Sequence, residues 1–164
     1  MDGLMEAAAE VLRKILYINL ATITPDGKPW NSPVYSAFDK DLNYYWLSYK
    51  LNQHSVNVRN NSSVFATVYD STVPASTGFG VYFQGSAREL KNPKEMFVAV
   101  KTVYGREKRK FRDITQFMKK FPRRIYQFKP DKVWVNGDGE IKGNFIDVRT
   151  ELDLERLKKA VFRK

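Results

Sequence analysis

The chain has 164 residues, no cysteine and a single histidine, and it carries 28 Lys and Arg against 18 Asp and Glu. This length fits one domain, and the lack of cysteine excludes disulfides, thiolate catalysis and cysteine-ligated metal centres. No run of about 18 apolar residues occurs and the first residues are acidic, so we expect no transmembrane helix, no signal peptide and a cytoplasmic location.

The positive charge is concentrated in one segment. Residues 1–100 hold nine Lys and Arg and nine Asp and Glu, whereas residues 101–132 hold twelve against three, and residues 133–164 hold seven against six. The net charge of +10 therefore comes almost wholly from residues 101–132.

The first half of the chain predicts one helix and three strands. Apolar residues at helical spacing indicate a helix over residues 3–16. Strands are then predicted over residues 17–24, 30–38 and 42–49, with a tight turn at Pro25-Asp26-Gly27-Lys28. Three strands joined by short connections indicate an antiparallel meander.

The second half alternates helices and strands. The pattern predicts a short helix over 54–60, a strand over 64–69, a loop over 70–78 and a long strand over 80–90, where Gly85 indicates a bulge. A helical pattern runs from Pro93 to about residue 120 with a break near Gly105, followed by short strands over 125–128 and 132–135 and a turn at 136–139. Thr150 and Asp153 indicate a cap for a final helix over about 151–162.

Five or six antiparallel strands with flanking helices predict a mainly β fold, a β-barrel formed by one domain over residues 1–164 with its core at about 17–135. The single histidine rules out most histidine-rich metal sites, so no metal site is expected. No acid–base pair is distinctive enough to name a catalytic residue.

Three groups of residues carry a family resemblance. They are Leu20-Ala21-Thr22-Ile23 with Pro25 to Val34, then Tyr45-Trp46-Leu47-Ser48 with Gln53-His54-Ser55, Asn57 and Arg59-Asn60, and then Tyr69 to Pro74 with Gly80 to Leu90. In this order they resemble the pyridoxamine 5'-phosphate oxidase-like, FMN-binding split-barrel family. The resemblance covers about residues 15–91, with a weaker match to Trp134.

The resemblance implies an antiparallel, Greek-key-like split barrel that binds FMN at the interface of a homodimer. It implies an oxidoreductase of the flavin reductase or oxidase type, which transfers hydride or electrons to a small-molecule substrate. The vitamin-forming oxidases of the family use an Arg-Lys pair at the phosphate, and this chain has His54 and Ser55 instead. The fold and the flavin are therefore better supported than the reaction.

The resemblance also implies the cofactor-binding residues. The phosphate would lie where a helix begins after a polar turn, at Ser48, Lys50, Gln53, His54, Ser55 and Asn57. The flavin ring would lie beside Asn31, Ser32, Pro33, Val34, Trp46 and Leu47, and the second subunit would add Tyr82, Gln84 and Trp134. The alternatives are a solvent-facing helix cap, an ordinary edge strand and core packing of the aromatic residues.

Other interpretations remain open for the ligand and for residues 101–132. Haem or a deazaflavin could occupy the same slot, and a non-catalytic flavin-binding protein for storage or sensing is an alternative to an enzyme. The basic segment suits nucleic acid or another polyanion. A solvated face is the simpler interpretation, because no helix-turn-helix, RRM or KH signature accompanies it. Nucleic acid is therefore the less favoured partner, and no membrane partner is expected.

Overall fold

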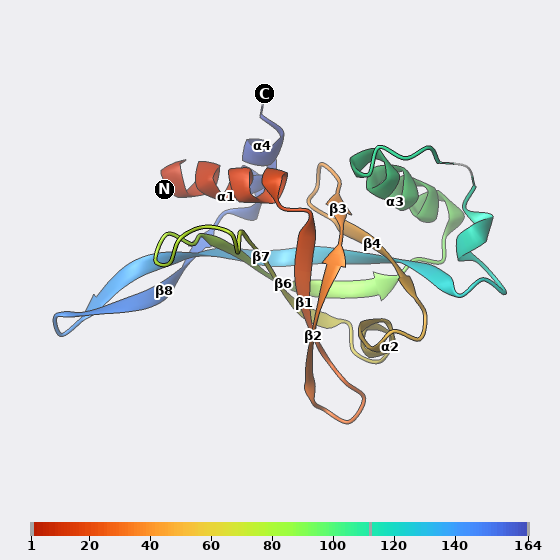
Figure 1. The fold of residues 1–164 in the computed structure, drawn as a ribbon, viewed down its shortest axis with the longest axis horizontal. Helices are drawn as coiled ribbons and strands as arrows, with labels where there is room; N and C mark the ends of the chain where they lie inside the picture. The colour runs from red at the N-terminus through yellow and green to blue at the C-terminus, as the bar shows by residue number, and fades with distance from the viewer. Residues whose placement is uncertain (1, 112, 164) are drawn as a thin grey trace.

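A computed structural model describes residues 2–111 and 113–163, and its centre is one antiparallel sheet that curls into a split barrel (Figure 1). Within these residues the strands are β1 (Tyr17–Ile23), β2 (Pro29–Tyr35), β3 (Ala37–Phe38), β4 (Tyr44–Tyr49), β5 (Ser63–Tyr69), β6 (Gly80–Glu89), β7 (Arg123–Ile141) and β8 (Asn144–Leu152). The helices are α1 (Asp2–Lys14), α2 (Gln53–Asn60), α3 (Pro93–Arg106), the 3-10 turn η1 (Thr115–Phe117) and α4 (Leu154–Phe162). The expectation of a mainly β barrel with flanking helices is confirmed.

The strand order explains the split in the barrel. It runs β2-β1-β5-β6-β7-β4-β3, and β8 pairs with β7 outside this path. Strand β2 forms one edge of the sheet, and the chain leaves it at Ser36, whose N–H donates to the carbonyl of Leu16 at 3.0 Å. The next residues form β3, which is the opposite edge. The meander expected for the first three strands is therefore wrong at the third, because β4 pairs with β3 and β7 rather than with β2. Strand β4 is buried on both faces and so requires a neighbour on each side.

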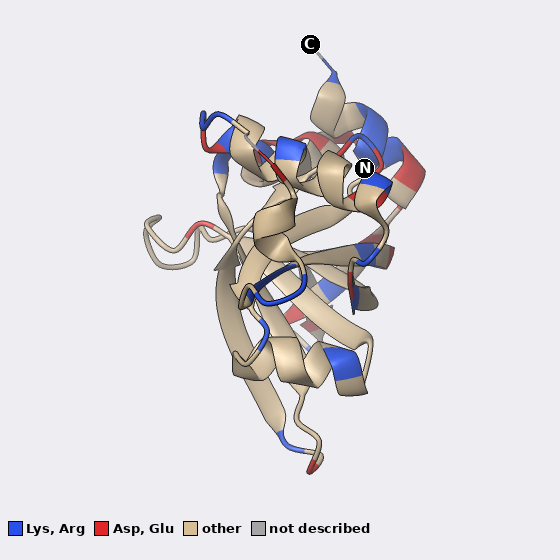
Figure 2. Cartoon of the chain, turned by 90° about the vertical axis from the view of Figure 1, so that its right-hand side faces the viewer, with Lys and Arg blue, Asp and Glu red and all other residues tan. Residues whose placement is uncertain are grey.

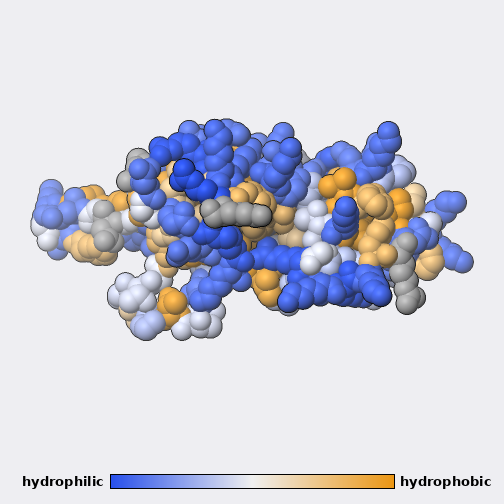
Figure 3. Space-filling view, turned by 90° about the horizontal axis from the view of Figure 1, so that it is seen from above, coloured by the Kyte–Doolittle hydropathy of each residue, from blue (hydrophilic) through white to orange (hydrophobic). Residues whose placement is uncertain are grey.

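Two apolar clusters hold the layers together. Large aromatic residues, among them Trp46, Phe83 and Phe128, fill the barrel, and α1 and α4 close one of its ends (Figure 1). The outer face of β4 and β7 is covered by α3, which buries Met96, Ala99 and Val103 at helical spacing. Seen from above, an apolar patch remains exposed over α3 among hydrophilic side chains (Figure 3). None of the described helices is long and apolar enough to cross a membrane.

The bulge expected at Gly85 is confirmed. The register between β6 and β7 shifts between Gln84 and Gly85, opposite Pro130. A Cβ atom on Gly85 would lie 2.1 Å from the backbone oxygen of Lys129, so only glycine fits this close approach. Pro130 lacks an N–H, which suits it to this break in the hydrogen-bond ladder.

The C-terminal third differs most from the sequence predictions. The two short strands are one strand, β7, and the turn predicted at residues 136–139 is wrong, because the strand continues to Ile141 and turns at Lys142-Gly143. The Asn136 side chain accepts from Gly80 N–H at 2.6 Å and donates to the Gly78 carbonyl at 3.1 Å, so it anchors the loop before β6 instead of making a turn. Strands β7 and β8 form a long hairpin that projects from the barrel (Figure 1).

The helix bounds also differ. The N-terminal helix ends at Lys14 rather than at residue 16, and the final helix begins at Leu154 rather than at 151. Helix α3 ends at Arg106, at the break expected near Gly105, but the helical pattern expected beyond it is reduced to the short turn η1. Asp153 alone caps the final helix, with Oδ1 accepting from the N–H groups of Glu155 and Arg156, while Thr150 lies in β8. The barrel strands extend past the expected limit of residue 135, to Leu152.

Candidate functional site

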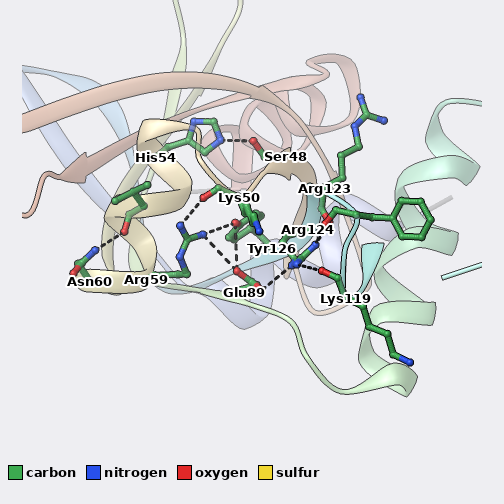
Figure 4. A network of polar contacts seen from close by, with 12 residues as sticks. Ser48, Lys50, His54, Arg59, Asn60, Glu89, Lys119, Arg123, Arg124 and Tyr126 are labelled. Carbon is green, nitrogen blue, oxygen red and sulfur yellow. Dashed lines mark hydrogen bonds and ion pairs between the residues drawn. The ribbon is translucent and has the colours of Figure 1, made fainter. Parts of the chain in front are cut away.

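The end of β4 and the start of α2 form a buried polar cluster. Ser48 Oγ lies 2.8 Å from His54 Nε2 (Figure 4). Asn52 Nδ2 donates to the same Ser48 Oγ at 2.8 Å. Burial lowers the pKa of His54, so its imidazole is neutral near pH 7. Since Asn52 supplies a hydrogen to Ser48, the serine hydroxyl can donate its own to Nε2, which leaves the histidine proton on Nδ1.

The other polar residues of α2 also point into the protein. Asn57 Nδ2 donates to Thr22 Oγ1 at 2.9 Å, and Gln53 Nε2 donates to Asn57 Oδ1 at 2.8 Å. The bond to Thr22 attaches α2 to β1, and the bond from Gln53 lies within the helix and holds the Asn57 amide in place. Ser55 is fully buried, and its Oγ makes no hydrogen bond within 3.5 Å among the described residues. The Tyr126 hydroxyl is nevertheless close enough for a weak interaction with it.

Backbone donors are free at the start of α2. Asn52 is the N-cap, its side chain makes no capping hydrogen bond, and the first helical bond runs from Val56 N–H to the Asn52 carbonyl. The N–H groups of Gln53, His54 and Ser55 therefore have no partner within the helix. A helix start with free N–H groups and the buried Ser55 hydroxyl fits an anion such as a phosphate.

Behind this turn lies a charged network that the sequence did not reveal. The Arg59 guanidinium donates to the Lys50 carbonyl and, at 3.0 Å, to the Tyr126 hydroxyl, and it lies 3.5 Å from Glu89 (Figure 4). Glu89 also lies 3.4 Å from Arg124 Nε. The network joins α2, β6 and β7 and fixes the backbone of the Lys50–Asn52 turn. Arg59 is one of the residues that carry the family resemblance. Nothing in the sequence pairs it with Glu89 or Tyr126, which lie 30 and 67 positions further along the chain.

The residues expected beside the flavin ring lie in two places. Asn31, Ser32 and Pro33 are at least partly exposed on the edge strand β2, while Val34 is buried. Trp46 is enclosed in the core and stacks on Tyr126, with ring centroids 5.4 Å apart, which matches the core-packing alternative. Leu47 packs against the cluster under α3.

The three residues expected from the second subunit share the outer face of the sheet. Tyr82 pairs with Trp134 across β6 and β7, and Phe65 lies 6.4 Å from Tyr82 and 6.3 Å from Trp134 between ring centroids. Gln84 is exposed two positions along β6. The Arg149 guanidinium lies 4.0 Å from the Tyr82 ring centroid. We call Phe65, Tyr82 and Trp134 the aromatic face. No hydrogen bond or ring contact among the described residues joins it to α2.

The class of protein is defined by its fold, which in the described residues is a split barrel of eight strands whose α2 begins with unpaired backbone donors. The chain belongs to the pyridoxamine 5'-phosphate oxidase family, because the family model described as Pyridoxamine 5'-phosphate oxidase matches residues 4–137. The resemblance in the sequence is thereby confirmed. No curated protein matches the sequence.

Solved structures share the fold with low sequence identity. A heme-binding protein from Mycobacterium smegmatis matches with a TM-score of 0.66 and 13% identity, over 95% of this chain and 60% of that one. The heme storage protein HutZ from Vibrio cholerae matches with a TM-score of 0.63 and 15% identity, over 77% and 89% of the two chains. An F420 reductase matches with a TM-score of 0.56 and 20% identity, over 77% and 94%.

These similarities extend to the fold alone. The chain spans about three fifths of the length of the Mycobacterium smegmatis protein. The names of the three proteins also point to different ligands. The ligand of this chain must therefore be argued from its own residues.

Proposed function

We propose that the chain binds FMN and acts as an oxidoreductase that passes hydride or electrons to a small-molecule substrate. The observation that carries this proposal is the start of α2, where three backbone N–H groups lack helical partners. The buried Ser55 hydroxyl beside them makes no hydrogen bond within 3.5 Å among the described residues. A phosphate group satisfies such donors and is further favoured by the helix dipole.

Different residues around the start of α2 would bind different parts of the cofactor. The N–H groups of residues 53–55 and Ser55 Oγ would hold the phosphate, and the exposed Lys50 would add charge. His54 is held by Ser48, so its contribution is a neutral Nδ1–H rather than a positive charge. The edge strand β2 would offer unpaired backbone groups to the flavin ring.

Bound flavin would supply the hydride and electron chemistry. The chain's own residues would bind the cofactor and orient it. They include no acid–base pair that we assign to proton transfer.

We further propose that a second copy of the chain covers the aromatic face. Phe65 is 42% exposed beside Tyr82 and Trp134, and such clustered rings are enriched in protein interfaces. The outer part of the β7–β8 hairpin has exposed apolar residues, Ile141 and Phe145. An isolated two-stranded hairpin is marginally stable in water, so a partner that covers it is expected. A two-fold dimer would bring the aromatic face of one copy to the cofactor of the other.

A haem-binding or storage role is the second candidate, because two proteins of the same fold are named for haem. A histidine-ligated haem needs a free imidazole nitrogen that is open to the iron. His54 is the only histidine, is buried, and has its Nε2 bonded to Ser48. This geometry favours FMN over a histidine-ligated haem.

The test is the absorption spectrum of the purified protein, with the released ligand identified by mass. We expect the bands of oxidised flavin and release of FMN. Haem bands, or a colourless protein that does not bind added FMN, would contradict the proposal. Turnover with NADH or NADPH and an artificial acceptor separates an oxidoreductase from a storage protein.

The phosphate site is tested by the double variant His54→Ala, Ser55→Ala. We expect FMN occupancy to fall at least tenfold while the circular dichroism spectrum is retained. Ser71→Ala, in an exposed loop, is the matched control. Full occupancy in the double variant would show that the phosphate binds elsewhere.

A further inference from the structure

The segment 101–124 carries cations that the protein does not neutralise. It holds ten Lys and Arg against two acidic residues. Two of the ten are used internally. Arg106 donates to the carbonyls of Leu12, Arg13 and Ile15 at the end of α1, and Arg124 pairs with Glu89. These two are part of the fold and not of a binding surface.

The other described cations of the segment are exposed. Apart from Arg106, six described cations of the segment make no ion pair: Lys101, Lys108, Lys110, Lys119, Lys120 and Arg123. We call them the basic surface. Figure 2, which faces this end of the molecule, shows Lys and Arg along the loops between α3 and β7. Elsewhere, cations such as Lys14, Arg88 and Arg156 are matched by carboxylates.

Aromatic rings accompany these cations. Lys120 Nζ lies 5.9 Å from the Phe121 ring centroid, and the Arg123 guanidinium lies 5.5 Å from that of Tyr49. Phe121 is 42% exposed and Tyr49 is 49% exposed, so both rings have open surface. A ring that can stack on a base, next to a cation that can meet a phosphate, is the combination that single-stranded nucleic acids require.

A hollow adjoins the same surface. A half-open cavity of about 390 Å³ lies between the end of α3 and η1, lined by Tyr104, Arg109, Lys110 and Gln116. The Arg109 guanidinium lies 4.9 Å from the Tyr104 ring centroid. The lining combines positive charge with an amide side chain. It suits a polar, negatively charged group better than an alkyl chain.

We propose that the basic surface binds single-stranded nucleic acid. Charge complementarity with phosphates and the exposed rings favour this ligand. An anionic lipid surface is the competing ligand, because an apolar patch is exposed on α3, the helix that carries Lys101. Phe121 and Tyr49 favour nucleic acid, since each ring lies close to a cation. The proposal does not depend on flavin, since neither the cavity nor the six cations include a residue assigned to the phosphate site.

Binding of a fluorescein-labelled 20-nucleotide RNA of mixed sequence, followed by fluorescence anisotropy, tests this proposal. If about five of the cations meet phosphates, the affinity falls about 100-fold between 50 and 200 mM salt. Neutralising four of them (Lys108→Gln, Lys110→Gln, Lys119→Gln, Lys120→Gln) should weaken binding at least 30-fold and flatten the salt dependence. Phe121→Ala alone should weaken it about tenfold through loss of stacking.

The control variant is Lys40→Ala, Lys159→Ala, which removes two exposed charges from other parts of the molecule. It should lower the affinity less than threefold. Flavin content and melting temperature are measured on every sample, so that a failure of the flavin proposal is seen separately.

Three results would overturn the proposal. They are no RNA binding at 50 mM salt, binding that the quadruple variant retains, and stronger binding to vesicles of 70% phosphatidylcholine and 30% phosphatidylserine than to RNA. Equal affinity for a duplex of the same length would overturn the assignment to single strands. Salt-sensitive RNA binding that the quadruple variant loses, and the control keeps, would support it.

Discussion

Replacing Arg59 by alanine tests whether the network behind α2 holds the candidate phosphate site in place. The guanidinium donates to the Lys50 carbonyl and to the Tyr126 hydroxyl, and both bonds would be lost. Hydrogen bonds from a charged group contribute about 1.5–3 kcal/mol each, and partial exposure of the site reduces this. Glu89 would keep Arg124 as a partner, so no carboxylate is left unpaired.

We therefore expect Arg59→Ala to lower the free energy of unfolding by about 2 kcal/mol. For a domain of this size that corresponds to a melting temperature lower by roughly 6 °C. The substitution should also weaken cofactor binding, because the Lys50–Asn52 turn sets the direction of the free N–H groups of α2. We expect the dissociation constant for FMN to rise about tenfold, which corresponds to about 1.4 kcal/mol.

Thermal unfolding and FMN titration by flavin fluorescence measure the two effects. Arg59→Lys is the matched control, since it keeps the charge but not the planar fork that reaches several acceptors. It should restore part of the stability and little of the FMN affinity. If Arg59→Ala loses stability but binds FMN within twofold of the natural chain, the network has only a structural role. If it also melts normally, the argument from these contacts fails.

Three further predictions concern other parts of the molecule. Burial lowers the pKa of His54, so the histidine takes up a proton more readily in the unfolded chain, and the free energy of unfolding measured by urea titration should fall as the pH is lowered from 7.5 to 5.0. His54→Gln should make the free energy of unfolding less dependent on pH, and an unchanged dependence would contradict the prediction. Replacing residues 138–147 by an Asn-Gly turn should leave the barrel folded but weaken self-association at least tenfold in sedimentation equilibrium, whereas an equally tight dimer would exclude the hairpin from the interface. Gly85→Ala should destabilise the protein by about 3 kcal/mol, because the added Cβ meets a backbone oxygen. Gly105→Ala is the control and should be neutral or slightly stabilising, because there is open space around this residue in α3; equal melting temperatures of the two variants would refute the close approach at Gly85.

Local features of the fold could be predicted from the sequence. Gly27 has φ of +82° in the turn expected at residues 25–28, and the bulge lies at Gly85. Both depend on glycine's freedom within a few neighbouring residues. The Asn136-Gly137 pair looks like a turn for the same reason, but a distant partner at Gly80 keeps it in a strand. Because the sequence predicts a turn at residues 136–139, it does not predict the β7–β8 hairpin.

The candidate site was less accessible from the sequence. The start of α2 lies where the strand and turn patterns indicated it, at Gln53. His54 and Ser55 are polar residues that pattern analysis places at the surface, and yet both are buried. Their burial depends on hydrogen bonds and packing to other elements. The contact of Arg59 with Tyr126 has the same origin, and no local signal marks it.

Helices α1 and α4 contact each other across a long stretch of sequence, and this constrains when the end of the barrel can be closed. Arg13 of α1 donates to the Ala160 carbonyl, and Arg156 of α4 pairs with Asp2. Until α4 has emerged from the ribosome, the apolar side of α1, including Met5, lacks one of the elements that cover it. Emerging chains of this protein must therefore pass through a stage with an uncapped barrel, at which chaperones or premature association compete with completion.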